Sequence, residues 1–245
     1  MDEENLISEM SKCSEEELMK ILYVIHPNKP LTSEVINLLI DRGYTTKDKK
    51  LQNLLVITLS TNLDLFLEVV ESKLNKSLRD NCFTLPIVSL SGFEFEEVTD
   101  FIEIVICSNG LRLLDKLLFS IANGSLPFKV KLFYFKCCCS IITYNNNLSD
   151  EIMLDHIIIL IKIAELNNSN LWIKYKICEF LSRMKFKESF DYLDYLKNCD
   201  DSANIRMIAS IAIDSLAKLE KWFIYYSILS GGVRTWEQLF WVIIT

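Results

Sequence analysis

The chain has 245 residues, 50% of them hydrophobic and 24% charged, so it is long enough and apolar enough to bury a sizeable core. Only 6 glycines and 4 prolines are present. Because these residues punctuate turns and sheets, their scarcity argues against a turn-rich β-sandwich and favours long helices with short connections.

Capping residues and apolar periodicity predict the helices of the first half. Ser14 and Glu17 have the spacing of a capping box, which predicts a helix ending near Ile25, after an N-terminal cap of residues 1–13. Gly43 is predicted to stop the second helix, because glycine is common just beyond a helix end. The further predicted helices are Leu31–Arg42, a segment from Thr45 or Thr46 to about Ser60, Leu63–Leu74 behind Asn62, Leu78–Leu90 interrupted at Pro86, and Glu94–Cys107.

The second half shows the same signals. Pro127 suits the first turn of a helix, and the acidic start at Asp150 and Glu151 matches the positive end of a helix dipole. No credible strand alternation and no long linker are present, so we expect one all-α domain over residues 1–245. The predicted helices are Leu111–Ala122, Phe128–Thr143, Ser149–Leu166, Leu171–Met184, Glu188–Lys197 and Asn204–Lys221, followed by an apolar closing segment over residues 222–245.

Three of these helices open with an aliphatic residue followed by a basic one: Val130-Lys131, Ile173-Lys174 and Ile205-Arg206, at spacings of 43 and 32 residues. In the last, the small residues Ala209 and Ala212 follow the pair and the helix ends in leucines. This helix resembles the second helix of a HEAT repeat. The resemblance implies a right-handed solenoid, or superhelix, of antiparallel helix pairs (HEAT/ARM-like) over about residues 14–221. Such solenoids mostly present long surfaces to other proteins.

Six acidic residues form two stripes with the same spacing. Each stripe occupies positions i, i+4 and i+7 of one predicted helix, which lie on a single helical face. If the two helices are equivalent members of successive repeats, the stripes lie side by side as a docking surface for a basic protein. The alternative is an ordinary solvated face, the commoner meaning of a charge run. The stripes are Asp64, Glu68 and Glu71, and Glu96, Asp100 and Glu103, 32 residues further along.

The charge of the whole chain agrees with a basic partner. The formal net charge is −7, and it falls on residues 1–125, which carry 12 Lys and Arg against 20 Asp and Glu. Residues 126–245 carry 14 against 13. An acidic surface repels phosphate backbones, so we expect no nucleic-acid ligand, and it steers a basic protein toward the first half.

Residues that carry catalytic chemistry are few. His26 precedes Pro27 at a predicted helix end, and His156 shares a helix with Glu151 and Asp155, but no second His or Cys at ligand spacing completes a metal site. The sequence has no glycine-rich phosphate loop, nucleophile elbow or His-Glu-x-x-His motif. We therefore expect no catalytic residue, no metal and no cofactor.

The eight cysteines include three consecutive ones, Cys137 to Cys139, and lack the spacing of a disulfide framework. Helical periodicity predicts Cys137 and Cys138 in the core and Cys139 between the two faces. The acidic start of the chain is unlike a secretory signal, and no apolar run reaches the length of a membrane span. We therefore expect a cytoplasmic protein with reduced thiols and no membrane partner.

The apolar closing segment has two interpretations. Trp236, Phe240 and Trp241 either pack as a last helix pair on the core or form an exposed interface for a partner or a second copy, giving a homodimer.

One enzymatic alternative follows from the architecture. DNA glycosylases that remove alkylated bases resemble this chain in their HEAT-like helices, but they need a basic concave groove with aromatic residues. The only comparable stretch is expected to be a solvated face beside core aromatics. It consists of Trp172, Lys174, Tyr175, Lys176, Arg183, Lys185 and Lys187.

The function expected from these observations is stoichiometric protein binding without catalysis. Abundant Asn, Ile, Lys and Leu suggest an AT-rich bacterial genome. Among acidic bacterial proteins without catalytic motifs, an immunity protein that covers and neutralises a basic toxin fits this charge. A general HEAT-like adaptor or scaffold is the first alternative, and the DNA glycosylase is the second.

Overall fold

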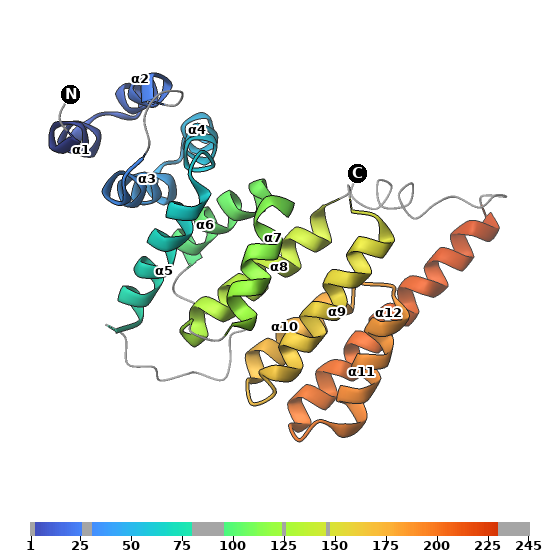
Figure 1. The fold of residues 1–245 in the computed structure, drawn as a ribbon. Coiled ribbons are helices and arrows are strands. Elements are labelled where there is room, and N and C mark those ends of the chain that lie inside the picture. Colours follow the sequence, from blue (N-terminus) through green and yellow to red (C-terminus); the bar gives the residue numbers. More distant parts are fainter. Residues whose placement is uncertain (1–2, 26–30, 80–95, 124–125, 146–147, 230–245) are drawn as a thin grey trace. The chain divides into compact units, whose positions relative to one another are not determined.

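The computed structural model describes residues 3–25, 31–79, 96–123, 126–145 and 148–229 (Figure 1). Within these ranges the regular structure is helical throughout and contains no strand, so the all-α prediction is confirmed. The chain divides into two compact units, Met1–Asn145 and Asn146–Thr245, and each is described by itself. One continuous domain over residues 1–245 stays a prediction.

The first unit contains eight described helices. The helix α7 has the predicted bounds. Helix α1 was predicted only as an N-terminal cap and not as a helix. Its segment is short and charged and, among its described side chains, buries only Leu6 and Met10, so its apolar periodicity is weak. Most of the predicted helix Leu78–Leu90 lies outside the described residues. The helices are α1 (Glu3–Lys12), α2 (Glu15–Ile25), α3 (Ser33–Thr45), α4 (Lys49–Leu59), α5 (Leu63–Arg79), α6 (Glu96–Asn109), α7 (Leu111–Ala122) and α8 (Phe128–Tyr144).

The capping box at the start of α2 is confirmed. The Ser14 backbone N–H and hydroxyl each donate to Glu17 Oε2 at 2.9 Å, and the Glu17 N–H donates to Ser14 Oγ at 3.3 Å. For α4, by contrast, the predicted cap at Thr45 or Thr46 is wrong. Asp48 caps this helix by accepting the backbone N–H of Lys50 at 2.7 Å and that of Leu51 at 3.4 Å. A carboxylate at the N-cap accepts two N–H groups more effectively than a hydroxyl.

Gly43 does not stop α3, which continues to Thr45. The residue is buried, and a Cβ atom added there would lie 2.1 Å from Cε1 of Phe101 on α6. The glycine therefore provides space for the ring of Phe101, which is itself buried. The prediction was wrong because spacing along the chain does not distinguish a glycine that ends a helix from one that admits a neighbouring side chain.

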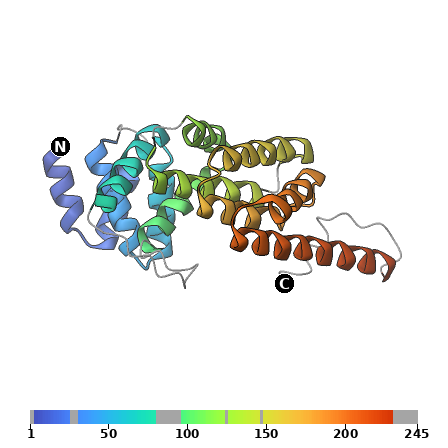
Figure 2. The same ribbon diagram turned by 90° about the horizontal axis from the view of Figure 1, so that it is seen from below.

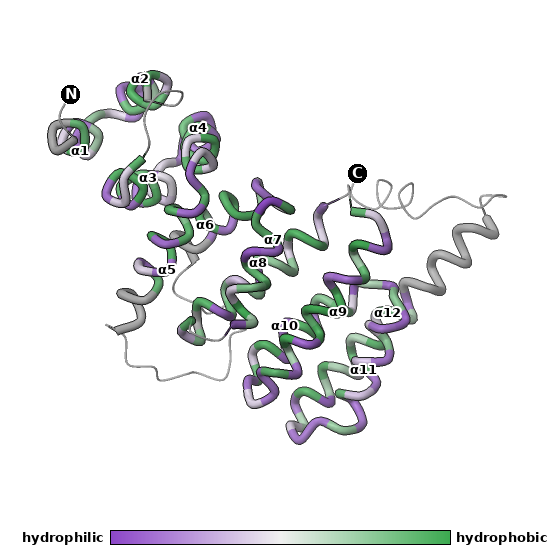
Figure 3. Tube along the Cα trace, in the orientation of Figure 1, coloured by the Kyte–Doolittle hydropathy of each residue, from purple (hydrophilic) through white to green (hydrophobic). Residues whose placement is uncertain are grey.

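Helix α8, the last of the first unit, contacts α5, α6 and α7. Its Tyr134 and Phe135 are among the largest fully buried side chains. Hydrophobic and hydrophilic residues alternate along the helices, as expected for helices with one buried side (Figure 3). Between α6 and α7 the chain turns at one residue, Gly110, whose φ of +39° favours glycine.

The second unit contains four described helices, α9 (Asp150–Leu166), α10 (Leu171–Leu181), α11 (Lys187–Cys199) and α12 (Ala203–Leu229). Helices α11 and α12 pack along each other, and α10 contacts both (Figures 1 and 2). Ala209 and Ala212 of α12 are buried, as their small size predicted. Helix α12 continues past the predicted end at Lys221, so the first part of the closing segment extends this helix.

Among the described residues, no single helix is long and apolar enough to cross a bilayer. The helix Lys49–Leu59 and the segment Leu63–Leu74 reach the required length and composition only when taken together, and the chain bends by 109° between them.

Candidate functional site in the acidic stripes of α5 and α6

The two predicted acidic stripes lie on α5 and α6, which both contact α8. That the two stripes lie side by side as one surface stays a prediction. Within each stripe the exposure falls along the helix. Asp64 and Glu68 of α5 are exposed and Glu71 is half-buried, while Asp100 of α6 is exposed and Glu103 is half-buried. Glu96 begins α6, but its side chain lies outside the described part of the structure. We call Asp64, Glu68 and Asp100 the outer carboxylates, and Glu71 and Glu103 the inner carboxylates.

The inner carboxylate of α5 bonds to the buried face of α8. Tyr134 Oη donates a hydrogen bond to Glu71 Oε1 at 3.2 Å. Burial of Tyr134, together with the negative charge of Glu71, holds the pKa of this phenol well above its ordinary value. Tyr134 therefore stays protonated and remains a donor to Glu71.

The inner carboxylate of α6 also bonds to α8, through Lys136 and Ser140. Lys136 Nζ lies 2.6 Å from Glu103 Oε2, and Ser140 Oγ donates to Glu103 Oε1 at 3.0 Å. Burial works against the charge of Lys136, but the hydrogen bond and negative charge of Glu103 outweigh it, so the pKa of Lys136 lies above its ordinary value. Glu103 is therefore part of the packing between α6 and α8.

One outer carboxylate has a cationic partner in its own unit. Lys116 Nζ of α7 lies 2.5 Å from Asp64 Oδ1, but the side chain of Asp64 is 81% exposed and that of Lys116 is 45% exposed. Exposed pairs of this kind contribute about 0–1 kcal/mol, so a partner's Lys or Arg can replace Lys116 at little cost. Asp64 thus remains available for binding, as do the exposed Glu68 and Asp100.

The chain was compared with protein-family models, curated proteins and solved structures. None of them matches. The function is therefore inferred from the residues of the chain itself.

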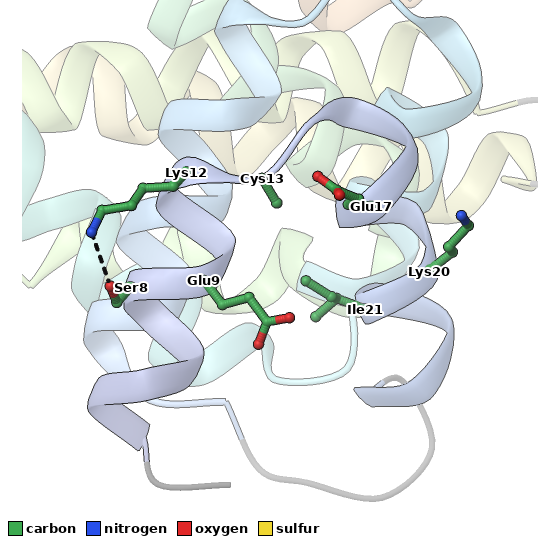
Figure 4. Close-up of a pocket in the computed structure, with 7 residues that line it drawn as sticks. All are labelled: Ser8, Glu9, Lys12, Cys13, Glu17, Lys20 and Ile21. Atoms are coloured by element: carbon green, nitrogen blue, oxygen red, sulfur yellow. Dashed lines mark hydrogen bonds between the residues drawn. The ribbon is translucent and has the colours of Figure 1, made fainter.

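An open groove between α1 and α2 was not predicted, because one of its two helices was not predicted (Figure 4). Its volume is about 560 Å³. Charges of both signs line it, so it does not select a ligand by charge. Glu17 is already engaged by the Ser14 backbone N–H and hydroxyl, which lower the pKa of this carboxyl. The lining residues are Ser8, Glu9, Lys12, Cys13, Glu17, Lys20 and Ile21.

The cysteines of α8 lie where the periodicity predicted them. Cys137 and Cys138 are fully buried, and Cys139 is half-buried. Burial raises the pKa of Cys137 and Cys138, and burial with the nearby charge of Glu103 raises the pKa of Cys107 on α6 to about 11. These thiols therefore stay protonated at neutral pH and react slowly, because only the thiolate is a strong nucleophile.

The two histidines bring no metal-binding group together in the described ranges. His156 Nδ1 lies 2.7 Å from the carbonyl oxygen of Ile152 on the same helix, and His26 lies outside these ranges. No group of three His, Cys, Asp or Glu side chains in the described part of the chain is placed to hold a metal ion.

The basic stretch around α10 is largely paired with acids. Lys174 is buried and its Nζ lies 2.5 Å from Asp200 Oδ2, so the prediction of a solvated face is wrong for this residue. Lys176 and Arg183 lie 2.8 Å and 3.4 Å from the carboxylate oxygens of Glu179. These pairings reduce the positive potential that DNA binding requires. The predicted C-terminal interface of Trp236, Phe240 and Trp241 lies outside the described residues.

Proposed function

We propose that this chain is a non-enzymatic binding module that captures a basic protein through the outer carboxylates Asp64, Glu68 and Asp100. In its most specific form the proposal is a bacterial, cytoplasmic immunity protein that neutralises a basic toxin. The observation that carries it is the division of the stripes: three carboxylates face solvent while two are bonded to α8.

The inner carboxylates hold in place the helices that carry the outer ones. Glu71 and Glu103 anchor α5 and α6 to Tyr134 and Lys136 of α8. Because the helices that carry the outer carboxylates are held in place, less backbone order has to be gained on binding, and complementary charge speeds the encounter with a basic partner. We therefore assign recognition to the outer carboxylates and helix packing to the inner ones.

The right-handed HEAT-like solenoid belongs to the same proposal. The pairing of α11 with α12 and the contacts of α10 with both support a stack of helix pairs. So does the buried alanine face of α12, formed by Ala209 and Ala212. A stack of this kind would provide an extended surface of the sort that binds other proteins.

The test is an affinity capture from a lysate of the source cells. The wild-type chain is compared with the triple variant Asp64→Lys, Glu68→Lys, Asp100→Lys. The control variant is Glu9→Lys, Glu16→Lys, Glu34→Lys, which makes the same change of net charge at exposed residues of α1, α2 and α3. We expect wild type and control to retain one basic protein in equal amounts, and the triple variant to lose it. Added salt should weaken the capture because it screens exposed charges.

The outcomes separate the candidate functions. A single basic partner held one-to-one, whose toxicity the wild-type chain suppresses on co-expression, supports an immunity protein. Several partners that bind more weakly support an adaptor. Equal capture by the wild type and the triple variant contradicts binding through the outer carboxylates.

A further inference from the structure

A second surface lies in the other unit, on α9. Ile152, Ile159 and Leu166 are exposed to 47%, 39% and 78% of their surface. The core side of the same helix is formed by different residues, including Ile157 and Leu160, which are fully buried. Helix α9 therefore has an apolar stripe in addition to its buried side. We call Ile152, Ile159 and Leu166 the α9 seam.

The spacing of the seam fits a helical partner. Its residues are seven apart, so they drift by only about 20° per step around a straight helix. Apolar residues at this period form a narrow line, with one residue in each heptad where a coiled coil has two, along which a second helix can pack side by side. A flat or irregular partner would not require this spacing.

Two opposite charges border the seam on one flank. Asp155 and Lys162 are both exposed, and they are also seven residues apart. If two copies of α9 pack antiparallel about a two-fold axis at Ile159, Ile152 lies opposite Leu166 of the second copy. Asp155 then comes within one residue of the level of Lys162 of the second copy, and symmetry makes this pair twice. In parallel packing about a two-fold axis along the helices, the flank that carries Asp155 and Lys162 in one copy would lie on the opposite side of the seam from the same flank of the other copy, so this pair could not form.

We propose that the α9 seam is a homodimer interface on which a second copy of this chain docks antiparallel, with Asp155 of each copy paired with Lys162 of the other. A second copy is the expected partner because the charges are self-complementary. Along one flank an acid precedes Ile159 and a base follows it, so two antiparallel copies place each acid beside a base. This interface is separate from the acidic stripes and does not rest on their function.

The first measurement is the dimer dissociation constant of the full chain by sedimentation equilibrium. We expect a concentration-dependent dimer for the wild type. Ile159→Asp brings two like charges together at the two-fold axis. It should raise the dissociation constant by more than about tenfold, which corresponds to about 1.4 kcal/mol. Ile57→Asp, at a 53% exposed isoleucine of α4 in the other unit, should leave it unchanged.

Charge reversal provides a second readout that does not touch the apolar seam. Asp155→Lys alone and Lys162→Asp alone should each raise the dissociation constant several-fold, because each creates two like-charge pairs. The double variant Asp155→Lys, Lys162→Asp should restore it to near the wild-type value. Far-UV circular dichroism and thermal melting check that every variant is folded.

Three results would overturn the proposal. One is a wild-type chain that is monomeric at every concentration. Another is a dimer whose dissociation constant is unaffected by Ile159→Asp but is raised by Trp236→Ala or Trp241→Ala, which would move the interface to the C-terminal segment. The third is a double charge variant that dimerises no better than the single ones, which would exclude the antiparallel pairing.

Discussion

Gly43 lies so close to Phe101 that one added methyl group should lower the stability of the fold. In an open helical position, replacing glycine by alanine stabilises a protein by about 1 kcal/mol. Here the new Cβ would meet the buried Phe101 ring at 2.1 Å. We expect Gly43→Ala to destabilise the first unit by about 1–3 kcal/mol through overpacking, measured by urea unfolding.

A double variant checks the cause. Phe101→Leu removes part of the ring that alanine would meet, so Gly43→Ala should cost less in the Phe101→Leu background than in the wild type. Additive effects of the two substitutions would show that the methyl group does not act through Phe101.

Lys174 and Asp200 are a second sensitive pair. Their side chains are only 7% and 3% exposed, with Nζ and Oδ2 2.5 Å apart. Removing one partner of a buried ion pair leaves an uncompensated charge and typically costs about 3–5 kcal/mol. We expect Lys174→Met to lower the unfolding free energy by about this amount, and the further change Asp200→Asn to recover part of it.

The matched control is Lys187→Met. Lys187 pairs with Asp191 at 3.6 Å, but these side chains are 84% and 59% exposed. Its loss should change the unfolding free energy by less than about 0.5 kcal/mol. A similar cost at Lys187 and Lys174 would contradict the importance of burial.

At the scale of the element, the start of α2 should depend on pH. The Ser14 backbone N–H and hydroxyl bond to the Glu17 carboxylate and lower its pKa below the ordinary value. A carboxyl with a lowered folded-state pKa stabilises the helix start above its unfolded pKa. This contribution is lost as the pH falls through the folded pKa.

We expect the Ser14 amide resonance to shift as Glu17 is protonated, with a midpoint below that of an ordinary glutamate. Glu17→Gln keeps a capping-box acceptor but cannot titrate, so this pH-dependent shift should disappear. An NMR titration toward acidic pH measures both. A midpoint at the ordinary glutamate value would contradict the hydrogen bonds to Ser14.

Helix α8 should protect Cys137 and Cys138 from alkylation. Burial raises the pKa of Cys137 and Cys138, whereas Cys199 of α11 is exposed. We expect iodoacetamide to label Cys199 first in the native protein, and Cys137 and Cys138 only after denaturation. The half-buried Cys107, with a pKa of about 11, should react slowly at neutral pH. Peptide mass spectrometry reads the order, and rapid native labelling of Cys138 would contradict it.

Some elements could be predicted from the sequence because their determinants are local. The Ser14–Glu17 box and the bounds Leu111–Ala122 depend on residues within a few positions of each other. The stop predicted at Gly43 was wrong because the reason for that glycine is Phe101, 58 residues away. The cap of α4 was misplaced because Thr46 bonds elsewhere, donating to Glu15 at 2.6 Å.

At the scale of the whole molecule, the candidate site was predictable only in part. The spacing of the stripes placed three acids along each helix, but which of them face solvent depends on the neighbour. Tyr134, Lys136 and Ser140 of α8 bond to Glu71 and Glu103, and no spacing within α5 or α6 reveals this. Lys174 was likewise predicted to lie on a solvated face, because its partner Asp200 lies at the end of α11 and spacing within α10 does not reveal it.

Helix α6 packs against α3, although the two helices are not consecutive in the chain. Contacts of α6 with α3 and α4, and of α8 with α5, connect residues before Arg79 with residues after Glu96. Continuity of the backbone between these residues is therefore not what holds the two sets of helices together. A first unit expressed as two separate polypeptides, 1–79 and 96–145, should reassemble into a noncovalent complex. Phe101→Ala should weaken this complementation, which makes the first unit a candidate split reporter.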